Sequence, residues 1–136
     1  MIVIDASVAV AWCFADEATA EGDAVLDRVR NNGGRVPSLW HLEVANVMRQ
    51  AERKGRISEA GVSQRLEQLA QLPIATDFDT AARAWGPTLA LARAHTLTVY
   101  DAAYLELATR LGLPLASKDK ELLAAARSSG VEVIDC

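Results

Sequence analysis

Short apolar runs alternate with longer helical patterns along the whole chain, and this alternation limits the possible folds more than any other feature of the sequence. The apolar runs are rich in β-branched residues and too short for helices, which favours strands. They are "IVID" (2–5), "RVP" (35–37), "PIAT" (73–76), "LPLAS" (113–117) and "VEVI" (131–134). Strands separated by helical crossovers pair in parallel and are covered on both faces. We therefore predict a three-layer α/β/α sandwich around a parallel sheet of about five strands.

The segments between these runs have helical patterns that end at glycine or proline. We predict one helix from Ser7 onward, and others over 18–30, 40–53, 58–72, 79–94, 99–111 and 120–129. Gly86 and Pro87 fall inside the 79–94 segment, where a local break is expected. No internal repeat, linker or low-complexity segment divides the chain, so residues 1–136 are expected to form a single domain.

The charge balance restricts how this chain can bind nucleic acid. Eighteen acidic and 14 basic residues give a net charge of −4 and a pI near 5.1. Passive electrostatic binding of nucleic acid relies on a basic surface, which this balance disfavours. Cys13 and Cys136 stand far apart, so neither a zinc site nor a disulfide framework is indicated. With no export signal and no apolar run of about 20 residues, a soluble cytoplasmic protein is expected.

Two aspartates stand at or just beyond the ends of predicted strands. Asp5 ends the first apolar run, and Asp119 follows the fourth. In parallel α/β sheets, ligands bind beyond the carboxyl ends of the strands, where the strand order reverses. Each residue also has a purely structural interpretation as a helix cap that accepts backbone N–H groups.

Two further acidic residues fall on the packed faces of predicted helices. Glu43 lies on an apolar stripe formed by Trp40, Val44, Val47, Met48 and Ala51. A carboxylate there costs several kcal/mol unless it is paired or bound to a metal, although a stripe-edge glutamate can also reach solvent. Asp101 precedes the inward positions Tyr104, Leu105 and Ala108. The sequence "TVYD" also fits a capping box with Thr98 as the N-cap, which would explain Asp101 without chemistry.

The four carboxylates carry more weight together than singly. Two follow strands at the carboxyl edge, and two are near the starts of helices that can border the same crevice. Converging carboxylates repel one another, at a cost of about 1 to 4 kcal/mol for a pair 4 Å apart. A divalent cation removes this repulsion, and ligation by oxygen alone favours Mg²⁺ or Mn²⁺ over zinc. His41 and His95 stand alone and are expected to be surface or packing residues.

The order and spacing of these motifs resemble a known family. "VIDASVAVAW", "LEVANVMR", "LTVYDAAYLELA" and "LPLASKDKEL" resemble the PIN-domain ribonucleases, and most of all the VapC toxins of type II toxin–antitoxin pairs. The resemblance covers essentially the whole chain. It implies an acidic metal-binding and catalytic quartet formed by Asp5, Glu43, Asp101 and Asp119, with Asp5 and Asp101 as the first choices for direct ligands. Positions matching Ser7, Asn46 and Ser117 would support the site.

The resemblance also implies a reaction and partners. A metal-activated water would hydrolyse RNA phosphodiester bonds and leave 5′-phosphate and 3′-hydroxyl ends. One or two Mg²⁺ or Mn²⁺ ions would be needed. A small VapB-like antitoxin would cover the active site, and a homodimer is expected, for which Leu66 and Leu69 are candidate surface positions. Lys118 and Lys120 are candidates for phosphate contact.

Some alternatives remain open at this level. The basic run "RQAERKGR", which starts at Arg49, either guides RNA or is an ordinary solvated helix end. A phosphoacceptor signalling domain would share the sheet, and Asp77 and Asp79 follow the third predicted strand as such a domain requires. A third alternative is a binding module that has the fold but no catalysis. The presence of all four acidic residues argues against it.

Overall fold

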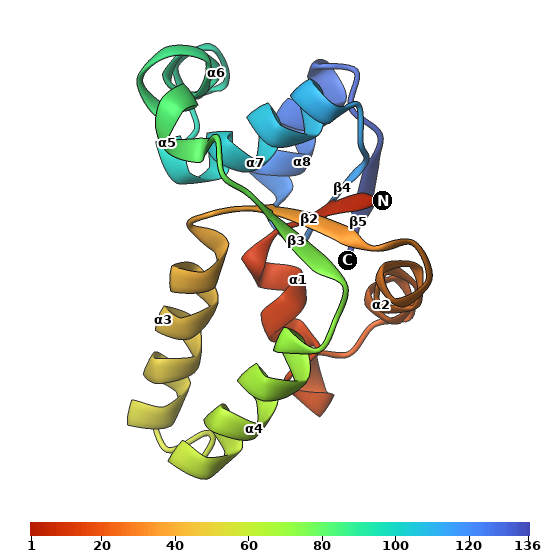
Figure 1. The fold of residues 1–136 in the computed structure, drawn as a ribbon, viewed down its shortest axis with the longest axis vertical. Coiled ribbons are helices and arrows are strands. Elements are labelled where there is room, and N and C mark those ends of the chain that lie inside the picture. Colours follow the sequence, from red (N-terminus) through yellow and green to blue (C-terminus); the bar gives the residue numbers. More distant parts are fainter.

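Five short strands pair in parallel in the computed structural model, which describes residues 1–136 (Figure 1). The strands are β1 (Ile2–Ile4), β2 (Gly34–Pro37), β3 (Ile74–Asp77), β4 (Leu115–Ser117) and β5 (Val133–Asp135). Each expected apolar run overlaps one of them, with ends that differ by at most two residues from the prediction. Together with the helices on both faces, this confirms the predicted three-layer α/β/α fold.

The strand order β3-β2-β1-β4-β5 places a reversal of direction beside β1. The chain first adds β2 and β3 on one side of β1, and then returns to add β4 and β5 on the other side. Val3 pairs with Arg35 on β2 and with Leu115 on β4. The topological switch point of the sheet therefore lies between β1 and β4, which is where ligands bind in open α/β sheets.

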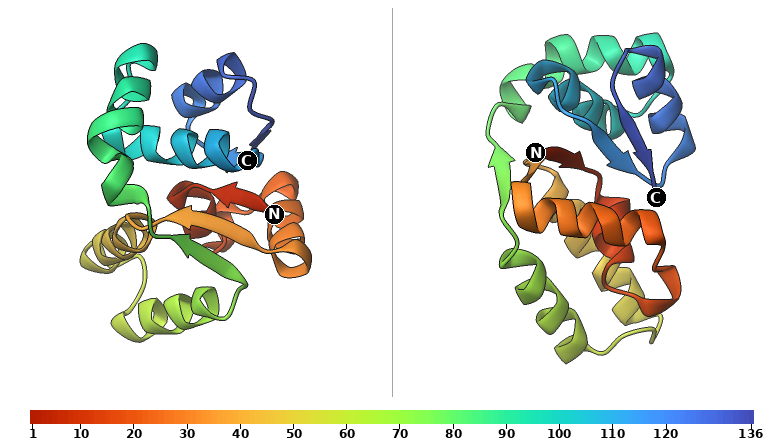
Figure 2. Two further views of the ribbon diagram at one scale, coloured as in Figure 1. Left: turned by 45° about the horizontal axis from the view of Figure 1, so that its top comes forward. Right: turned by 90° about the vertical axis from the view of Figure 1, so that its right-hand side faces the viewer.

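Helices cover both faces of the sheet (Figure 2). One layer contains α1 (Ala6–Ala11), α2 (Ala20–Asn32), α3 (Trp40–Arg53) and α4 (Glu59–Ala70). The other contains α5 (Thr80–Arg83), α6 (Leu89–His95), α7 (Val99–Leu111) and α8 (Lys120–Ser128). A short 3-10 helix, η1 (Ala15–Glu17), joins α1 to α2. No helix combines the length and the apolar character needed to cross a bilayer.

The predicted break at Gly86 and Pro87 is present. A turn of π-helix, η2 (Ala84–Thr88), separates α5 from α6 and contains Pro87. Proline cannot donate a helical hydrogen bond, so the chain accommodates it by widening the helix locally. The segment leaves Trp85 almost fully exposed.

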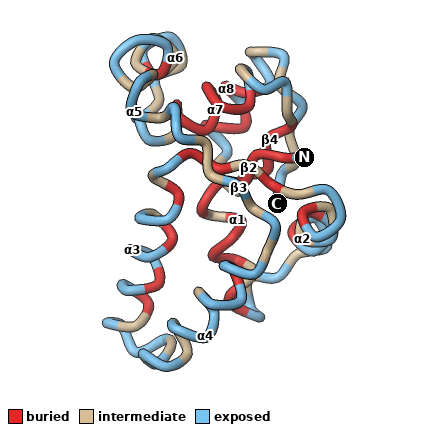
Figure 3. The backbone as a smooth tube through the Cα atoms, viewed as in Figure 1, coloured by how far each residue is buried: buried red, intermediate tan, exposed pale blue.

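The core surrounds the central strands (Figure 3). All three residues of β1 are fully buried, and the inner faces of α1, α3, α7 and α8 pack around them. Most of the predicted stripe on α3 is confirmed, because Trp40, Val44, Met48 and Ala51 are buried. Val47 was predicted wrongly, since it is 40% exposed. It lies on the same side of α3 as Glu43, one turn further along, at the margin of the packed face.

Candidate active site

Asp5 follows β1 directly, beside β4 at the switch point. Its side chain is only 6% exposed. The Ser7 hydroxyl donates to Asp5 Oδ2 over 2.9 Å, and the Ser117 hydroxyl donates to the same oxygen over 2.7 Å. The capping interpretation of Asp5 is wrong, because its side chain forms no capping hydrogen bond to α1. The residue is held by hydroxyl groups instead.

The two serines connect Asp5 to the turn between β4 and α8. The Lys118 backbone N–H donates to Ser7 Oγ over 3.1 Å, and the Asp119 backbone N–H donates to Ser117 Oγ over 2.9 Å. Each hydroxyl therefore accepts from the turn and donates to Asp5. Both side-chain bonds fall on Oδ2, so Oδ1 forms no hydrogen bond to another side chain.

Asp119 is the N-cap of α8, as its structural interpretation predicted. Its Oδ1 accepts from the backbone N–H groups of Glu121 (2.9 Å) and Leu122 (3.2 Å). Oδ2 accepts no hydrogen bond and is free for another role. Capping and a role in the site are therefore compatible, because they use different oxygens of one carboxylate.

Glu43 lies in the first turn of α3 and is half-buried. The Tyr104 hydroxyl of α7 donates to Glu43 Oε1 over 2.5 Å. Tyr104 itself is fully buried, so this bond fixes the glutamate against the packed interior. The alternative in which Glu43 reaches away into solvent is not what the structure shows. Oε2 accepts no hydrogen bond.

Asp101 lies in the first turn of α7, after the predicted N-cap. Its backbone N–H donates to Thr98 Oγ1 over 3.1 Å, which confirms Thr98 as the cap. The second half of a capping box is missing, because the Thr98 N–H does not donate to the Asp101 carboxylate. Tyr104, Leu105 and Ala108 are buried as predicted, and Asp101 stands half-buried at the edge of that face.

Burial and neighbouring negative charges raise the pKa values of Asp5, Glu43 and Asp101. Burial raises the pKa of Asp5, and the negative charge of Asp119 adds to the rise, against the hydroxyl bonds from the two serines. Burial likewise raises the pKa of Glu43, with contributions from Asp5 and Asp101. Burial, then Asp119 and Asp5, raise the pKa of Asp101. Glu121, which the sequence did not single out, adds a smaller repulsion at Asp101.

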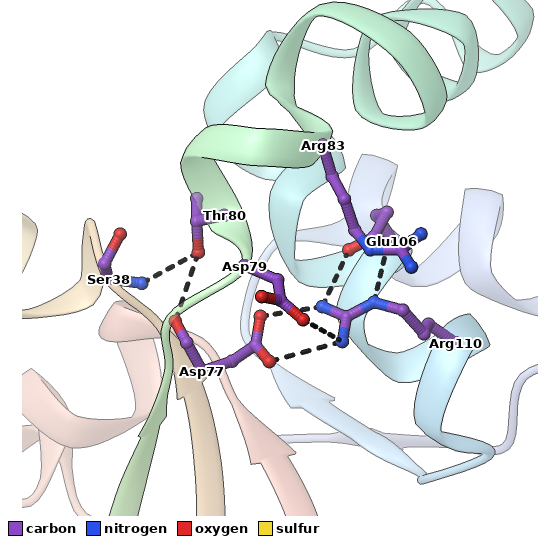
Figure 4. A network of polar contacts seen from close by, with 7 residues as sticks. All are labelled: Ser38, Asp77, Asp79, Thr80, Arg83, Glu106 and Arg110. Atoms are coloured by element: carbon purple, nitrogen blue, oxygen red, sulfur yellow. Dashed lines mark hydrogen bonds and ion pairs between the residues drawn. The ribbon is translucent and has the colours of Figure 1, made fainter.

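A second acidic cluster shows what charge compensation looks like in this protein (Figure 4). Arg110 on α7 donates to both oxygens of Asp77, over 3.2 and 2.7 Å, and its Nε donates to Glu106 over 2.8 Å. Arg83 also pairs with Glu106. The Arg110 guanidinium holds the pKa of Asp77 below its usual value. Asp5, Glu43, Asp101 and Asp119 differ because none of them forms an ion pair.

The donor set fits a hard divalent cation, within a limit set by the geometry. No three acidic, histidine or cysteine side chains lie close enough to ligate one ion directly. Mg²⁺ keeps several of its waters and needs only one or two protein carboxylates, so this spacing suits an ion bound partly through water. Asp5 Oδ1, Glu43 Oε2, Asp119 Oδ2 and both carboxylate oxygens of Asp101 have no side-chain or capping bond.

The residues predicted to contact RNA or to support the site differ in exposure and in their bonding partners. Arg49 pairs with Glu52 in the same helix at 2.5 Å, and Lys118 Nζ donates to the Cys136 carbonyl over 3.2 Å. Asn46 is exposed and forms no hydrogen bond, and Lys120 is exposed at the first position of α8. The roles of all four residues stay predictions.

Sequence reasoning missed the part played by Tyr104. It was identified only as a packing residue, whereas its hydroxyl reaches Glu43 across 61 residues of chain. A tyrosine three residues after Asp101 on the inward face was the available signal, because buried tyrosine hydroxyls need a partner. The histidines behave as expected. His41 stacks edge-on against Trp40, and His95 contacts the Ser129 hydroxyl.

Comparison with known proteins identifies the family. The model of the PIN domain matches residues 2–128. Ribonuclease VapC3 of Pyrobaculum aerophilum is 31% identical over 121 residues, covering 89% of this chain and 91% of that protein. Ribonuclease VapC12 of Mycobacterium tuberculosis is 33% identical over 126 residues, covering 90% and 89%.

Solved structures agree with this result at the level of the fold. The crystal structure of PAE2754 from Pyrobaculum aerophilum superposes with a TM-score of 0.70 at 24% identity, covering 97% of this chain and 87% of that one. FitAcB from Neisseria gonorrhoeae gives a TM-score of 0.68 at 16% identity, covering 99% and 97%. The resemblance predicted from the motifs is confirmed, and the chain belongs to the PIN-domain family.

Proposed function

We propose that this protein is a VapC-type endoribonuclease, the toxin of a toxin–antitoxin pair. It hydrolyses RNA phosphodiester bonds with Mg²⁺ or Mn²⁺ and leaves 5′-phosphate and 3′-hydroxyl ends. Family membership and relatives named as VapC ribonucleases over about nine-tenths of the chain support this proposal. Its reaction places the protein in the cytoplasm, where its RNA substrate is found.

The observation that carries the proposal is the uncompensated acidic cluster. Asp5 is a buried carboxylate, and its charged neighbours within the site are other carboxylates. Buried charges are normally paired or bound to metal, because an unpaired one costs several kcal/mol. Asp77 and Glu106 follow that rule through Arg110. A bound cation would satisfy it for the cluster around Asp5, which has no cationic side chain.

The roles of the side chains follow from which oxygens are fixed. Ser7 and Ser117 hold Asp5 by Oδ2 and leave Oδ1 without a side-chain bond. Tyr104 holds Glu43 by Oε1 in the same way. When bound, the divalent ion would lower the pKa of a water and neutralise charge on the phosphate. Asp5 and Asp101 are our choices for direct contact with it, with Glu43 and Asp119 acting through water.

Cationic support for the RNA is expected from the turn after β4. Lys120 is exposed there and has no ion-pair partner, whereas Lys118 is occupied by the Cys136 carbonyl. Arg49 is bound to Glu52, which favours the solvated-helix interpretation of its basic run. Lys120 is therefore the stronger candidate for a phosphate contact.

An antitoxin partner and a homodimer remain part of the proposal. The candidate dimer positions Leu66 and Leu69 do not form an open surface, because Leu69 is buried and Leu66 packs against the core. With Trp40 and Val44 they line an apolar groove of about 360 Å³ between α3 and α4. Co-expression with a candidate VapB-like antitoxin, followed by light scattering of the purified complex, tests both partners.

The phosphoacceptor alternative is disfavoured by the position of Asp77. Its two oxygens are occupied by Arg110, and the same guanidinium holds the pKa of Asp77 low. A carboxylate engaged in this way cannot readily attack a phosphodonor. Treatment with acetyl phosphate should therefore leave the protein unlabelled.

The test of the proposed function is end-mapped cleavage of a total RNA pool. Purified protein is incubated with Mg²⁺, with Mn²⁺ or with chelator, beside an Asp5→Asn control prepared identically. Metal-dependent cuts with 5′-phosphate ends that vanish in the control are expected. Equal cutting in both samples would identify a contaminant, and 2′,3′-cyclic phosphate ends would rule out a water nucleophile.

A further inference from the structure

Tyr100 is an exposed aromatic residue that the fold does not use. Its side chain is 67% exposed, on the first turn of α7. Its hydroxyl forms no hydrogen bond, and its ring takes part in neither an aromatic pair nor a cation–π contact. Single exposed apolar residues are common, so exposure alone means little. Tyr100 directly precedes Asp101 in the chain, and this position beside a predicted site residue suggests a role in binding.

Helix geometry places Tyr100 on the side of α7 that faces the acidic site. Residues four apart lie on the same side of a helix, and Tyr104 is four residues after Tyr100. Tyr104 reaches Glu43, so that side of α7 faces the site. The Thr98 cap fixes the backbone of the first turn of α7, so Tyr100 projects from a helix rather than from a loop.

The protein has few free positive charges with which to bind the RNA backbone, so other kinds of contact would add to its affinity for RNA. The chain carries a net charge of −4. Arg49 is paired with Glu52, Arg56 is paired with Asp16 and Glu17, and Lys118 is bonded to a carbonyl. Among Arg49, Lys118 and Lys120, only Lys120 has no partner. A bound metal ion attracts one phosphate, but it does not bind the other nucleotides of a single-stranded RNA. Aromatic stacking supplies affinity that does not depend on charge.

We propose that Tyr100 is a stacking platform for an RNA base next to the scissile phosphate. This inference rests on the proposed ribonuclease function. Asp101 would face the phosphate while the neighbouring ring meets the base, so that one helix turn contacts two parts of one nucleotide. A flat exposed ring fits a base better than it fits the aliphatic segment of a protein partner, because a base offers a matching π-face.

Four substitutions separate stacking from simple apolar contact. Tyr100→Phe keeps the ring and should change KM for single-stranded RNA by less than about two-fold. Tyr100→Ala should raise KM about 5- to 100-fold, with a smaller change in kcat. Tyr100→Leu keeps apolar bulk without a ring and should resemble the alanine variant. Leu111→Ala is the matched control, because Leu111 is 38% exposed at the far end of the same helix.

Salt dependence and fluorescence supply a signature that a structural role would not give. Binding of labelled single-stranded RNA is measured in chelator, where the proposed cleavage cannot proceed, from 50 to 300 mM salt, by anisotropy. Tyr100→Ala should lower log K equally at every salt concentration, because stacking releases no counterions. Lys120→Glu should instead change the slope. In RNA with 2-aminopurine beside the mapped cleavage site, quenching on binding should require the ring at position 100.

The outcomes separate this inference from the proposed function. If the wild type cleaves RNA and Tyr100→Ala matches Leu111→Ala in KM, stacking is refuted while the ribonuclease stands. If Tyr100→Leu works as well as Tyr100→Phe, the contact with RNA is apolar and does not need a ring, and stacking is refuted. If the wild type neither cleaves nor binds RNA, both proposals fail together.

Discussion

Replacing Asp101 with asparagine should stabilise the metal-free protein while removing its response to metal. Asp101 is half-buried and has no cationic partner, and its pKa is raised by burial and by the charges of Asp119 and Asp5. Asparagine has nearly the same shape and no charge. The substitution therefore removes repulsion without creating a cavity.

The magnitude follows from the neighbours of Asp101. A like-charged pair 4 Å apart costs about 4 kcal/mol at the effective dielectric of a protein surface and about 1 kcal/mol in water. The carboxylates here are more widely spaced than metal ligands, and Asp101 is half-exposed, so solvent screening leaves about 1 kcal/mol for each of its two main pairs. The substitution also removes a negative charge that stabilises the first turn of α7, and this loss cancels about 0.3 to 1 kcal/mol of the gain. The net gain is about 1 kcal/mol, or roughly 2 to 5 °C in Tm.

The assay is thermal and urea unfolding of both proteins in chelator, repeated with 5 mM Mn²⁺. The wild type should gain stability with Mn²⁺ through linkage, and Asp101→Asn should gain much less. The advantage of the variant in chelator should be present near pH 7 and should fade toward pH 4. This sign follows because a raised folded-state pKa means that the penalty is fully present above that pKa and is lost as the pH falls to the ordinary pKa of an aspartate.

Asp27→Asn is the matched control, because Asp27 is an exposed helical aspartate next to Arg30. Removing its charge should not raise stability in chelator. If Asp101→Asn instead lowers stability by 1 kcal/mol or more at pH 7, the residue acts mainly at the helix start and the repulsion argument is wrong.

Three further substitutions test the contacts around the site and the paired cluster. Tyr104→Phe should lower the free energy of unfolding in urea by about 1 to 2 kcal/mol, and it should weaken Mn²⁺ binding roughly ten-fold, because Glu43 loses the hydroxyl that orients it. An unchanged Mn²⁺ affinity, measured by electron paramagnetic resonance, would contradict this. Ser117→Ala should lower the free energy of unfolding by about 1 to 3 kcal/mol at pH 7 and by less at pH 4, since the lost hydrogen bond favours the charged form of Asp5. A loss of stability that does not depend on pH would mean that only packing was lost. Asp77→Asn should lower the free energy of unfolding by about 1 to 3 kcal/mol at pH 7. The difference from wild type should shrink as the pH falls below about 4, because the stability that comes with a lowered pKa is lost when the group is protonated. An equal loss of stability at pH 3 would rule out the ion pair as its source.

The strand pattern and the four acidic residues could be identified from the sequence because both depend on local rules. Strand-length apolar runs between helical segments specify a parallel sheet, and an aspartate after a strand lies at its carboxyl end whatever the details of packing. The Thr98 and Asp119 caps also follow from local pattern. Helix faces at their margins are less certain, which is why Val47 was assigned to the core and proved exposed.

The tertiary structure decided which oxygen of each carboxylate is occupied. No local rule connects Tyr104 to Glu43, or Ser117 to Asp5 across 112 residues, because these bonds depend on how the crossovers return the chain to β1. Pairing is decided in the same way. Asp77 meets an arginine 33 residues away, whereas the cluster at the switch point meets no cation. The sequence by itself determined the fold class and the positions of the acidic residues, since these follow from periodicity and chain order. Only the packing of distant segments determined which of those charges are neutralised and which remain free to bind a cation.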